Sequence, residues 1–397
     1  MSSQTRLDHK IMNNNYQLNK VVVLSRHGIR TPLLNTLEFL SEVTPYSWLK
    51  WDHPFGYLTT RGGTLESYFG HYFSQWLENH HIKLSTDNSE LFVYANSLQR
   101  TVATAQFFIA GAYAGQDIVI HHKYPIEKMD SIFDPSLRLD SAEFKQKVTE
   151  DINKADETES IFKNLAPSFE LLSDILDYKQ SNLYAKYQCE LADIPTELYL
   201  KKDEEPALLG SLAIGASAAD ALLLQYYSGF PKEQIAWGKI NSNEQWQQII
   251  NIRNQYVNLI CQTKTLAKHA AAELITMIDN LMQQEHHKVN LLVGHDSNIA
   301  SLLSALNFKH YQLPSQFETT PIGGKVIFQR FRHQISGQYF FKAEYVYPSF
   351  EQLHYGQALS LLNPPQHVQL ELENATTNSD GFYNWTDFEK RLNVTQP

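Results

Sequence analysis

The sequence has little of what disulfide-rich folds and metal sites are built from. Only two cysteines, Cys189 and Cys261, occur in its 397 residues. They lie far apart, match no metal-ligand spacing, and are too few for a disulfide framework. The stability of this protein must therefore come from a hydrophobic core, for which 43% hydrophobic residues are available.

Long hydrophobic runs are missing as well. No stretch approaches the roughly 18 apolar residues of a membrane span, and the segment from Met1 to Lys20 is too polar for a secretory signal. We therefore expect no membrane partner, and either a cytoplasmic chain or one whose leader has been removed.

Positive charge is the third scarce feature. The 33 Lys and Arg residues face 43 Asp and Glu residues, which gives a net charge of −10. This balance argues against a general nucleic-acid binder, so an anionic ligand must be captured by a local basic pocket. Protonation of all 16 His residues would change the net charge to −10 + 16 = +6. Mildly acidic conditions would therefore weaken the repulsion of an anionic substrate.

Short apolar runs predict an α/β fold. Val21–Leu24, Leu91–Tyr94 and Asn290–Val293 are continuous runs that suit strands buried on both faces of a parallel sheet. After the second run, Ser97 is a candidate N-cap and Gly111 a candidate stop for an amphipathic helix. Another helical stripe, Leu274, Met277, Ile278 and Leu281, precedes the third run. We predict a mostly parallel central sheet flanked by helices.

The pattern changes between about residues 130 and 262. Ser141–Ser160 is charged and helix-prone, and Ala216–Tyr227 is typical of a buried helix. Convincing strand patterns are few in this region. We predict an α/β domain formed by residues 1–130 and 263–397, and a mainly α-helical insertion domain formed by residues 131–262.

The most informative stretch follows the first predicted strand. It reads Ser-Arg-His-Gly-Ile-Arg-Thr-Pro from Ser25 to Pro32, so Arg26 and Arg30 flank His27. Guanidinium groups match phosphate oxygens, and α/β proteins bind ligands at the carboxyl ends of their strands. The alternative is a surface loop whose charges are merely solvated. Arg-His-Gly-x-Arg-x-Pro arises by chance in about one such chain in ten thousand, which favours a phosphate site.

A second candidate cluster follows the third predicted strand. His295 and Asp296 lie directly after Gly294. Taken alone, Asp296 could simply cap the following helix. If the two strands are parallel neighbours, both clusters meet at one edge of the sheet. Arg100, in the first turn of the helix after Ser97, could add a further guanidinium, the alternative being a surface arginine.

Together these residues predict phosphomonoesterase chemistry. The neutral imidazole of His27 would attack phosphorus and form a phosphohistidine, while Asp296 would protonate the leaving alkoxide and later activate water. The phosphate oxygens would be bound by Arg26, Arg30, Arg100 and His295. The predicted partner is a small-molecule phosphate monoester. We predict no cofactor and no metal, because the histidine pairs at 121–122 and 286–287 lack nearby carboxylates and are interpreted as surface residues.

These motifs make the sequence recognisable. It resembles the histidine acid phosphatases, the second branch of the histidine phosphatase superfamily, whose signatures are RHGxRxP near the N-terminus and HD far downstream. The resemblance covers nearly the whole chain and is carried by residues 25–32, 56–63, 94–106, 225–231 and 294–303. It implies an α/β domain with an inserted α-domain and an active site between them. It also implies that Arg26, His27, Arg30, Arg100 and His295 form the phosphate pocket and that Asp296 is the proton donor.

Within this family the chain is most similar to the bacterial periplasmic glucose-1-phosphatases. Leu33 and Glu205 match that subgroup, in which a bulky apolar group and an acid narrow the pocket mouth. Gly28, by contrast, matches the phytase-type members. The resemblance therefore implies hydrolysis of glucose 1-phosphate and similar sugar phosphates, with inositol hexakisphosphate as the alternative substrate. It also implies a periplasmic location if a leader has been removed.

Two other interpretations compete with this one. The first branch of the superfamily, which includes the phosphoglycerate mutases, also has Arg-His-Gly, but it lacks the following Arg-x-Pro and uses a Glu in place of the His-Asp pair. A catalytically inert phosphoester-binding protein would have lost His27 or Asp296, and both are present. The sequence leaves the oligomeric state open, with a homodimer as one candidate assembly.

Overall fold

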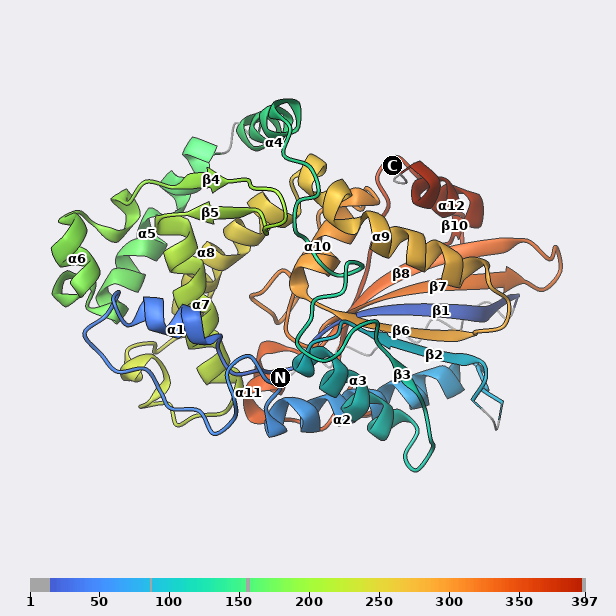
Figure 1. Ribbon diagram of the computed structural model, residues 1–397. Coiled ribbons are helices and arrows are strands. Elements are labelled where there is room, and N and C mark those ends of the chain that lie inside the picture. The colour runs from blue at the N-terminus through green and yellow to red at the C-terminus, as the bar shows by residue number, and fades with distance from the viewer. Residues whose placement is uncertain (1–14, 86–87, 155–157, 395–397) are drawn as a thin grey trace, which may run out of the picture.

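The structure is a computed structural model that describes residues 15–85, 88–154 and 158–394. Two parts of the sequence predictions lie outside these ranges, namely residues 1–14 of the N-terminal segment and residues 155–157 of the helix-prone stretch. Figure 1 shows a twisted sheet with helices on both of its faces and, to its left, a helical part made of α4 to α8. Within the described ranges, no helix combines the length and apolar character that a bilayer crossing requires.

The central sheet has a parallel half and an antiparallel half. Its strand order is β10-β8-β7-β1-β6-β2-β3, and β9 pairs with β8. The pairs among β1, β6, β2 and β3 are parallel, whereas β7 to β10 pair antiparallel. The strands of this sheet are β1 (Tyr16–Arg26), β2 (Leu91–Ala95), β3 (Ile120–His121), β6 (Val289–Gly294), β7 (Lys325–His333), β8 (Tyr339–Tyr347), β9 (Gln366–Gln369) and β10 (Tyr383–Asn384). A separate two-stranded antiparallel sheet is formed by β4 (Glu197–Tyr199) and β5 (Ala207–Leu209).

The helices cover the sheet and build the helical part. They are α1 (Leu34–Leu40), α2 (Thr60–Asn79), α3 (Gln99–Ala112), α4 (Ala142–Lys154), α5 (Thr158–Leu176), α6 (Asn182–Tyr187), α7 (Ser211–Tyr227), α8 (Asn243–Cys261), α9 (Lys264–Gln283), α10 (Asp296–Ala305), α11 (Phe350–Tyr355) and α12 (Trp385–Val394). Short 3-10 helices lie at Tyr178–Gln180, Leu191–Asp193 and Ile235–Gly238. The predicted α/β class is confirmed, and the three predicted strands lie within β1, β2 and β6.

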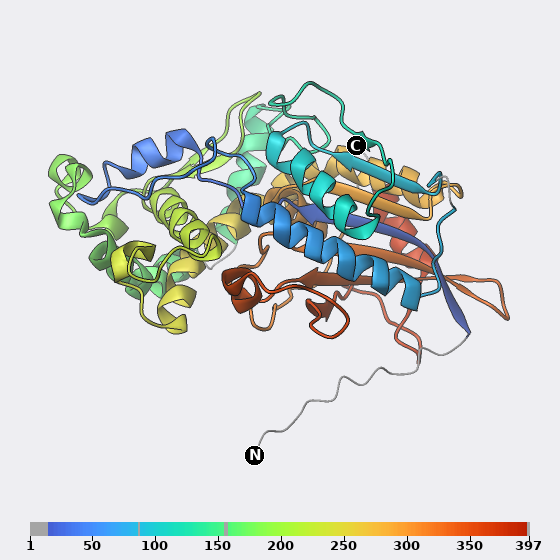
Figure 2. The same ribbon diagram turned by 90° about the horizontal axis from the view of Figure 1, so that it is seen from below.

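Alternate residues of β1 face two different cores. Val22 and Leu24 pack with residues of α9 and α10, whereas Val21 and Val23 pack with residues of α2 and α3. Figure 2 shows α2 and α3 crossing one face of the sheet. Because both faces are covered here, the Val21–Leu24 part of β1 is a continuous apolar run without polar alternation. This burial explains why β1, although it is the first strand of the chain, lies in the middle of the sheet.

The predicted limits of the helix after β2 are wrong at both ends. The N-cap of α3 is Leu98, because the Ser97 hydroxyl accepts a hydrogen bond from the backbone N–H of Tyr124 instead. At the other end, α3 continues through Gly111 to Ala112. A Cβ atom at Gly111 would lie 1.9 Å from the carbonyl oxygen of Ser67 on α2. The glycine therefore serves the close packing of α2 on α3 and does not end the helix.

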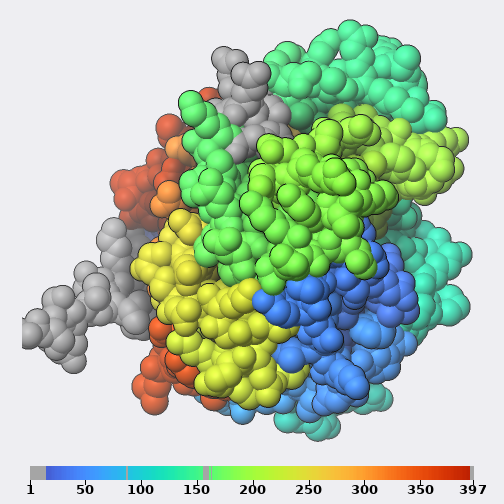
Figure 3. All heavy atoms as spheres, turned by 90° about the vertical axis from the view of Figure 1, so that its left-hand side faces the viewer, coloured from blue at the N-terminus to red at the C-terminus, as the bar shows by residue number. Residues whose placement is uncertain are grey.

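The helical part has its own hydrophobic core. This core is formed mainly by α5, α7 and α8, and it also takes in Leu37 and Leu40 of α1, which lies far away in the sequence. Figure 3 shows this N-terminal segment, in blue, against the green and yellow helical part. The predicted buried helix Ala216–Tyr227 lies within α7. The domain limits at residues 131 and 262 stay a prediction.

Candidate active site

The first and third predicted strands are parallel neighbours, as the sequence interpretation required. β1 pairs with β6 so that Arg26 is opposite Gly294, and the backbone N–H of His27 donates to the carbonyl oxygen of Gly294 at 3.0 Å. Both strands end at the same edge of the sheet. The two motifs, which are separated by more than half of the chain, therefore meet there (Figure 1).

His27 is held as a neutral imidazole with one free nitrogen. Its ring is buried, and its Nδ1 lies 2.9 Å from the carbonyl oxygen of Gly28. A carbonyl oxygen can only accept a hydrogen bond, so Nδ1 carries the proton and Nε2 keeps its lone pair. Burial, together with the charges of Arg100 and Arg26, lowers the pKa of His27 well below its ordinary value. The ring therefore stays unprotonated, and available as a nucleophile, under mildly acidic conditions.

Asp296, the first residue of α10, is an ionised carboxylate in this structure. Burial alone would raise its pKa, but the guanidinium groups of Arg26 and Arg253 overcome this effect and hold the pKa below its ordinary value. The Oδ2 atom of Asp296 lies 3.5 Å from Nη2 of Arg26 and accepts a hydrogen bond from Nη2 of Arg253. A proton donor must first gain a proton, so the charge around this carboxyl has to change before it can act as an acid.

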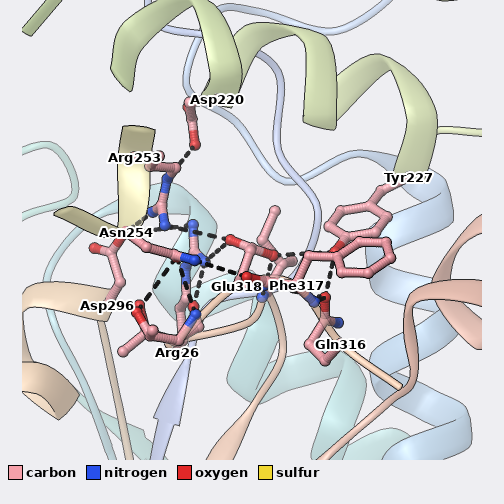
Figure 4. A network of polar contacts seen from close by, with 12 residues as sticks. Arg26, Asp220, Tyr227, Arg253, Asn254, Asp296, Gln316, Phe317 and Glu318 are labelled. Carbon is pink, nitrogen blue, oxygen red and sulfur yellow. Dashed lines mark hydrogen bonds and ion pairs between the residues drawn. The ribbon is translucent and has the colours of Figure 1, made fainter. Parts of the chain in front are cut away.

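Three charged residues that the sequence analysis missed complete this network. Glu318 accepts from Nη1 of Arg26 at 2.7 Å and lies 3.4 Å from Nη1 of Arg253. Asp220 pairs with Nη2 of Arg30 at 3.1 Å and lies 3.4 Å from Nε of Arg253. Figure 4 shows the guanidiniums of Arg26 and Arg253 between the carboxylates of Asp296 and Glu318.

The remaining predicted phosphate-binding residues lie around the same point. The ring centroids of His27 and His295 are 5.5 Å apart, and the amide nitrogen of Asn96 donates to Nε2 of His295 at 2.7 Å. Arg100 lies in the first turn of α3. Burial and the nearby charge of Arg30 lower the pKa of Arg100 to about 10, although the carboxylates of Asp296, Glu127 and Glu205 act in the opposite direction. Such a site favours a dianionic ligand.

A pocket of about 300 Å³ opens beside these groups. Its lining includes Arg30, Asp220, Arg253 and Asp296, and also Glu205, which the sequence analysis placed at the pocket mouth. Burial and the neighbouring carboxylates of Asp134 and Asp296 raise the pKa of Glu205. The pocket walls thus combine cations near β1 with carboxylates from the helical part.

Leu33 is not among the residues that line this pocket, although Arg30 and Thr36 of the same segment are. It precedes α1 and is 38% exposed. A Cβ atom at Gly56 would lie 3.0 Å from Cδ2 of Leu33 and 4.0 Å from Nη1 of Arg100. Leu33 is therefore near the phosphate-binding arginines on the side of Gly56. The structure brings it close to Arg100 but does not place it in the same wall as Glu205.

A buried ion pair lies directly behind the loop that carries His27. Nζ of Lys325 donates to Oε2 of Glu66 at 2.9 Å and to the carbonyl oxygen of Gly323 at 2.9 Å. A Cβ atom at Gly28 would lie 3.0 Å from Cγ of Glu66. On the other side, the backbone N–H of Gly28 donates to the Thr104 hydroxyl at 2.9 Å. The loop is therefore fixed by polar groups on both sides.

Metal ligands do not gather at this site. Among residues 15–85, 88–154 and 158–394, no group of three or more His, Cys, Asp or Glu side chains is arranged to hold a metal ion. Cys189 and Cys261 are both free thiols, and Cys261 lines the pocket.

The same architecture and motifs occur in known proteins. The family "Histidine phosphatase superfamily (branch 2)" matches residues 17–346. The chain is 42% identical to the glucose-1-phosphatase of Providencia rettgeri over 94% of its own length and 90% of that protein. It is also 42% identical to the glucose-1-phosphatase of Salmonella typhimurium, over 96% and 92% of the two chains. The solved structure of Hafnia alvei phytase in complex with myo-inositol hexakis sulphate is similar with a TM-score of 0.88 at 27% identity, over 96% of this chain and 98% of that one.

An α/β sheet that presents Arg-His-Gly-x-Arg-x-Pro and His-Asp at one edge defines a phosphatase of the histidine type. This chain belongs to the second branch of the histidine phosphatase superfamily. It is a phosphoric monoester hydrolase, as the resemblance implied.

Proposed function

We propose that this enzyme is a metal-independent acid phosphomonoesterase that acts through a phosphohistidine intermediate and hydrolyses glucose 1-phosphate and similar sugar phosphates. The observation that carries the proposal is the free Nε2 of a neutral His27 among four cationic or histidine side chains, next to a carboxyl group. The identity of 42% with two glucose-1-phosphatases supports the substrate class.

The first chemical step transfers the phosphoryl group to the enzyme. Nε2 of His27 attacks phosphorus, a P–N bond forms, and the P–O bond to the leaving group breaks. The phosphoryl oxygens are bound by Arg26, Arg30, Arg100 and His295, which balance their charge. The departing alkoxide takes a proton from Asp296 and leaves as an alcohol.

The second step releases phosphate. Asp296 is now ionised and removes a proton from a water molecule, whose oxygen attacks phosphorus. The P–N bond breaks, and its electron pair returns to Nε2 of His27. Inorganic phosphate leaves, and Asp296 releases the proton that it took from water, so that its carboxyl group is ionised again in the empty pocket. Acidic conditions favour this cycle because Asp296 must be protonated when the leaving group departs, and His27 stays neutral there because its pKa is low.

The pocket favours one phosphate and one neutral ring over a polyanion. Glu205 and Asp220 lie in its lining together with Tyr256, whose ring offers an apolar face. Carboxylates accept hydrogen bonds from sugar hydroxyls but repel additional phosphate groups. A phytase activity is the second candidate, and it is supported by Gly28 in the motif and by the similarity to Hafnia alvei phytase.

Two measurements test the proposal. Rates of phosphate release from glucose 1-phosphate, phytate and p-nitrophenyl phosphate, compared with and without EDTA, should rank glucose 1-phosphate above phytate and be unchanged by EDTA. Acid-labile phosphate should be trapped on the wild-type enzyme and on the control variant His286→Ala, whose histidine is exposed. His27→Ala should trap none and should lose turnover. More than a few per cent of activity in His27→Ala would contradict the nucleophile.

We also propose a periplasmic location, which requires an export leader that is removed from the mature enzyme. The proposal rests on the resemblance to periplasmic glucose-1-phosphatases. Fractionation of the source cells tests it, because phosphatase activity released by osmotic shock supports a periplasmic enzyme. Activity that stays with a cytoplasmic marker contradicts it.

A further inference from the structure

Arg253 comes from the helical part but points into the phosphate pocket. It belongs to α8, and its side chain is only 6% exposed. Its guanidinium contacts three carboxylates, those of Asp220, Asp296 and Glu318. Of these contacts, the one to Asp296 is a direct hydrogen bond between Nη2 and Oδ2. Arg253 is therefore the closest cation to the predicted proton donor, closer than Arg26 at 3.5 Å.

Among the groups around Asp296, Arg26 and Arg253 are the cations that hold its carboxyl group ionised. The charged and titratable groups that face it from the neighbouring elements are Arg26, His27, Arg100, Glu205, Asp220, Arg253, Cys261, His295, Glu318 and Tyr345. His27 and His295 are buried and neutral, and Glu205 and Asp220 repel a negative charge. The guanidinium group of Arg26 also forms an ion pair with Glu318, at 2.7 Å. Arg26 and Arg253 together keep the carboxylate ionised, and Arg253 is the one of the two that donates a hydrogen bond to it.

We propose that Arg253 is a positioning residue that controls when Asp296 carries its proton. In the empty pocket its charge helps to keep Asp296 ionised. The phosphoryl group of a bound substrate neutralises the same guanidinium, because Arg253 lines the pocket with Arg30 and Asp296. Asp296 then takes up the proton that it gives to the leaving group. This inference rests on the proposed function and adds that substrate binding itself causes Asp296 to take up its proton.

A purely structural role for Arg253 is the alternative. The residue joins α8 to groups of the sheet edge, and such a link would stabilise the contact between the helical part and the sheet. Arg61 offers a matched control for this role. It belongs to α2, and its Nε donates to the carbonyl oxygen of Tyr227 on α7 at 2.8 Å, outside the phosphate pocket. Both arginines are links between the same two parts of the molecule, but only Arg253 touches Asp296.

The first experiment compares pH profiles of kcat/KM, which report the free enzyme, for glucose 1-phosphate and p-nitrophenyl phosphate in wild type, Arg253→Met, Arg253→Lys and Arg61→Met. An opposite charge at this distance lowers a carboxyl pKa by about 1–3 units. Arg253→Met should therefore raise the pKa of Asp296 and move the basic limb of the pH profile for glucose 1-phosphate to higher pH by about one unit or more. The limb for p-nitrophenyl phosphate should stay in place, because p-nitrophenolate leaves without a proton. Arg253→Lys should stay near wild type, and Arg61→Met should move neither limb.

A second measurement needs no Arg253 variant. Sulfate is a phosphate mimic that takes up no proton in the weakly acidic range, so protons bound on its addition enter the protein. Calorimetry in buffers of different ionisation heat should show that wild type takes up more protons with sulfate than Asp296→Asn does. Equal uptake would overturn the inference, as would an equal loss of kcat/KM on both substrates with unmoved limbs in Arg253→Met. If wild type hydrolyses neither ester, the proposed function fails, and the sulfate comparison still tests the link between the anion and Asp296.

Discussion

Replacing Lys325 by methionine should strongly destabilise the protein, because it leaves the carboxylate of Glu66 buried without its partner. The two side chains are 0% and 3% exposed, and Nζ lies 2.9 Å from Oε2. The rings of Phe69 and Phe108 pack against the same ammonium group, so water has little access to it. Removing one partner of such a pair costs about 3–5 kcal/mol of unfolding free energy.

The loss of unfolding free energy in Lys325→Met should depend on pH. Burial raises the pKa of Glu66 above its ordinary value even with Lys325 present, and loss of the ammonium raises the pKa further. A group whose pKa is raised by folding binds its proton more tightly in the folded state, so its contribution to stability is lost as the pH rises. The deficit of Lys325→Met should therefore be larger at neutral than at mildly acidic pH.

A double variant serves as the control. Lys325→Met with Glu66→Leu removes both charges and keeps a similar apolar volume, so its unfolding free energy should return to within about 1 kcal/mol of wild type or exceed it. Urea unfolding of the wild type and the two variants, at both pH values, measures these differences. The reasoning fails if the single variant loses less than about 1 kcal/mol, or if the double variant is no more stable than the single one.

Other expected results concern the site itself. Asp296→Asn should lower activity on glucose 1-phosphate far more than on p-nitrophenyl phosphate, and equal losses would leave Asp296 a purely electrostatic role. His27 and His295 are held neutral by burial and by neighbouring arginines, so both take up protons on unfolding below their ordinary pKa. Stability of the free enzyme should therefore fall as the pH drops through the weakly acidic range, and His295→Ala should flatten that dependence in thermal melts. Glu205→Gln should raise the ratio of phytate to glucose 1-phosphate hydrolysis by about tenfold if ~1.4 kcal/mol of repulsion is relieved, and Leu33→Ala should act in the same direction. If the ratio of phytate to glucose 1-phosphate hydrolysis is unchanged in both variants, neither residue determines the substrate specificity.

The sequence predicts the parts of this site that depend on parallel strands. Arg26 and His27 follow one buried run and His295 and Asp296 follow another, and parallel neighbours must end at the same edge. The antiparallel strands β7 to β10 went unpredicted, because their apolar and polar residues give weaker local signals.

The partners of the motif residues are harder to predict. Asp220 and Arg253 do leave a signal, since each is an isolated charge on a helix that is otherwise largely apolar where it packs. Glu318 and Asn96 lie in loops, where no periodicity marks a buried side chain. Ser97 has the right chemistry for an N-cap, but in the folded protein its hydroxyl accepts a hydrogen bond from the backbone N–H of Tyr124. Local patterns cannot anticipate such long-range use of a side chain.

The central place of β1 has a consequence for how the chain folds. Val21 pairs with Val289 on one side and with Gln329 on the other. The strand that precedes the nucleophile His27 therefore cannot pair until these later parts of the chain have been synthesised. Contacts this distant in sequence close large loops and slow folding. Until β6 and β7 arrive, β1 is an unpaired apolar strand that is prone to aggregation. The catalytic loop should therefore form late, and this enzyme should depend on chaperones more than its moderate size suggests.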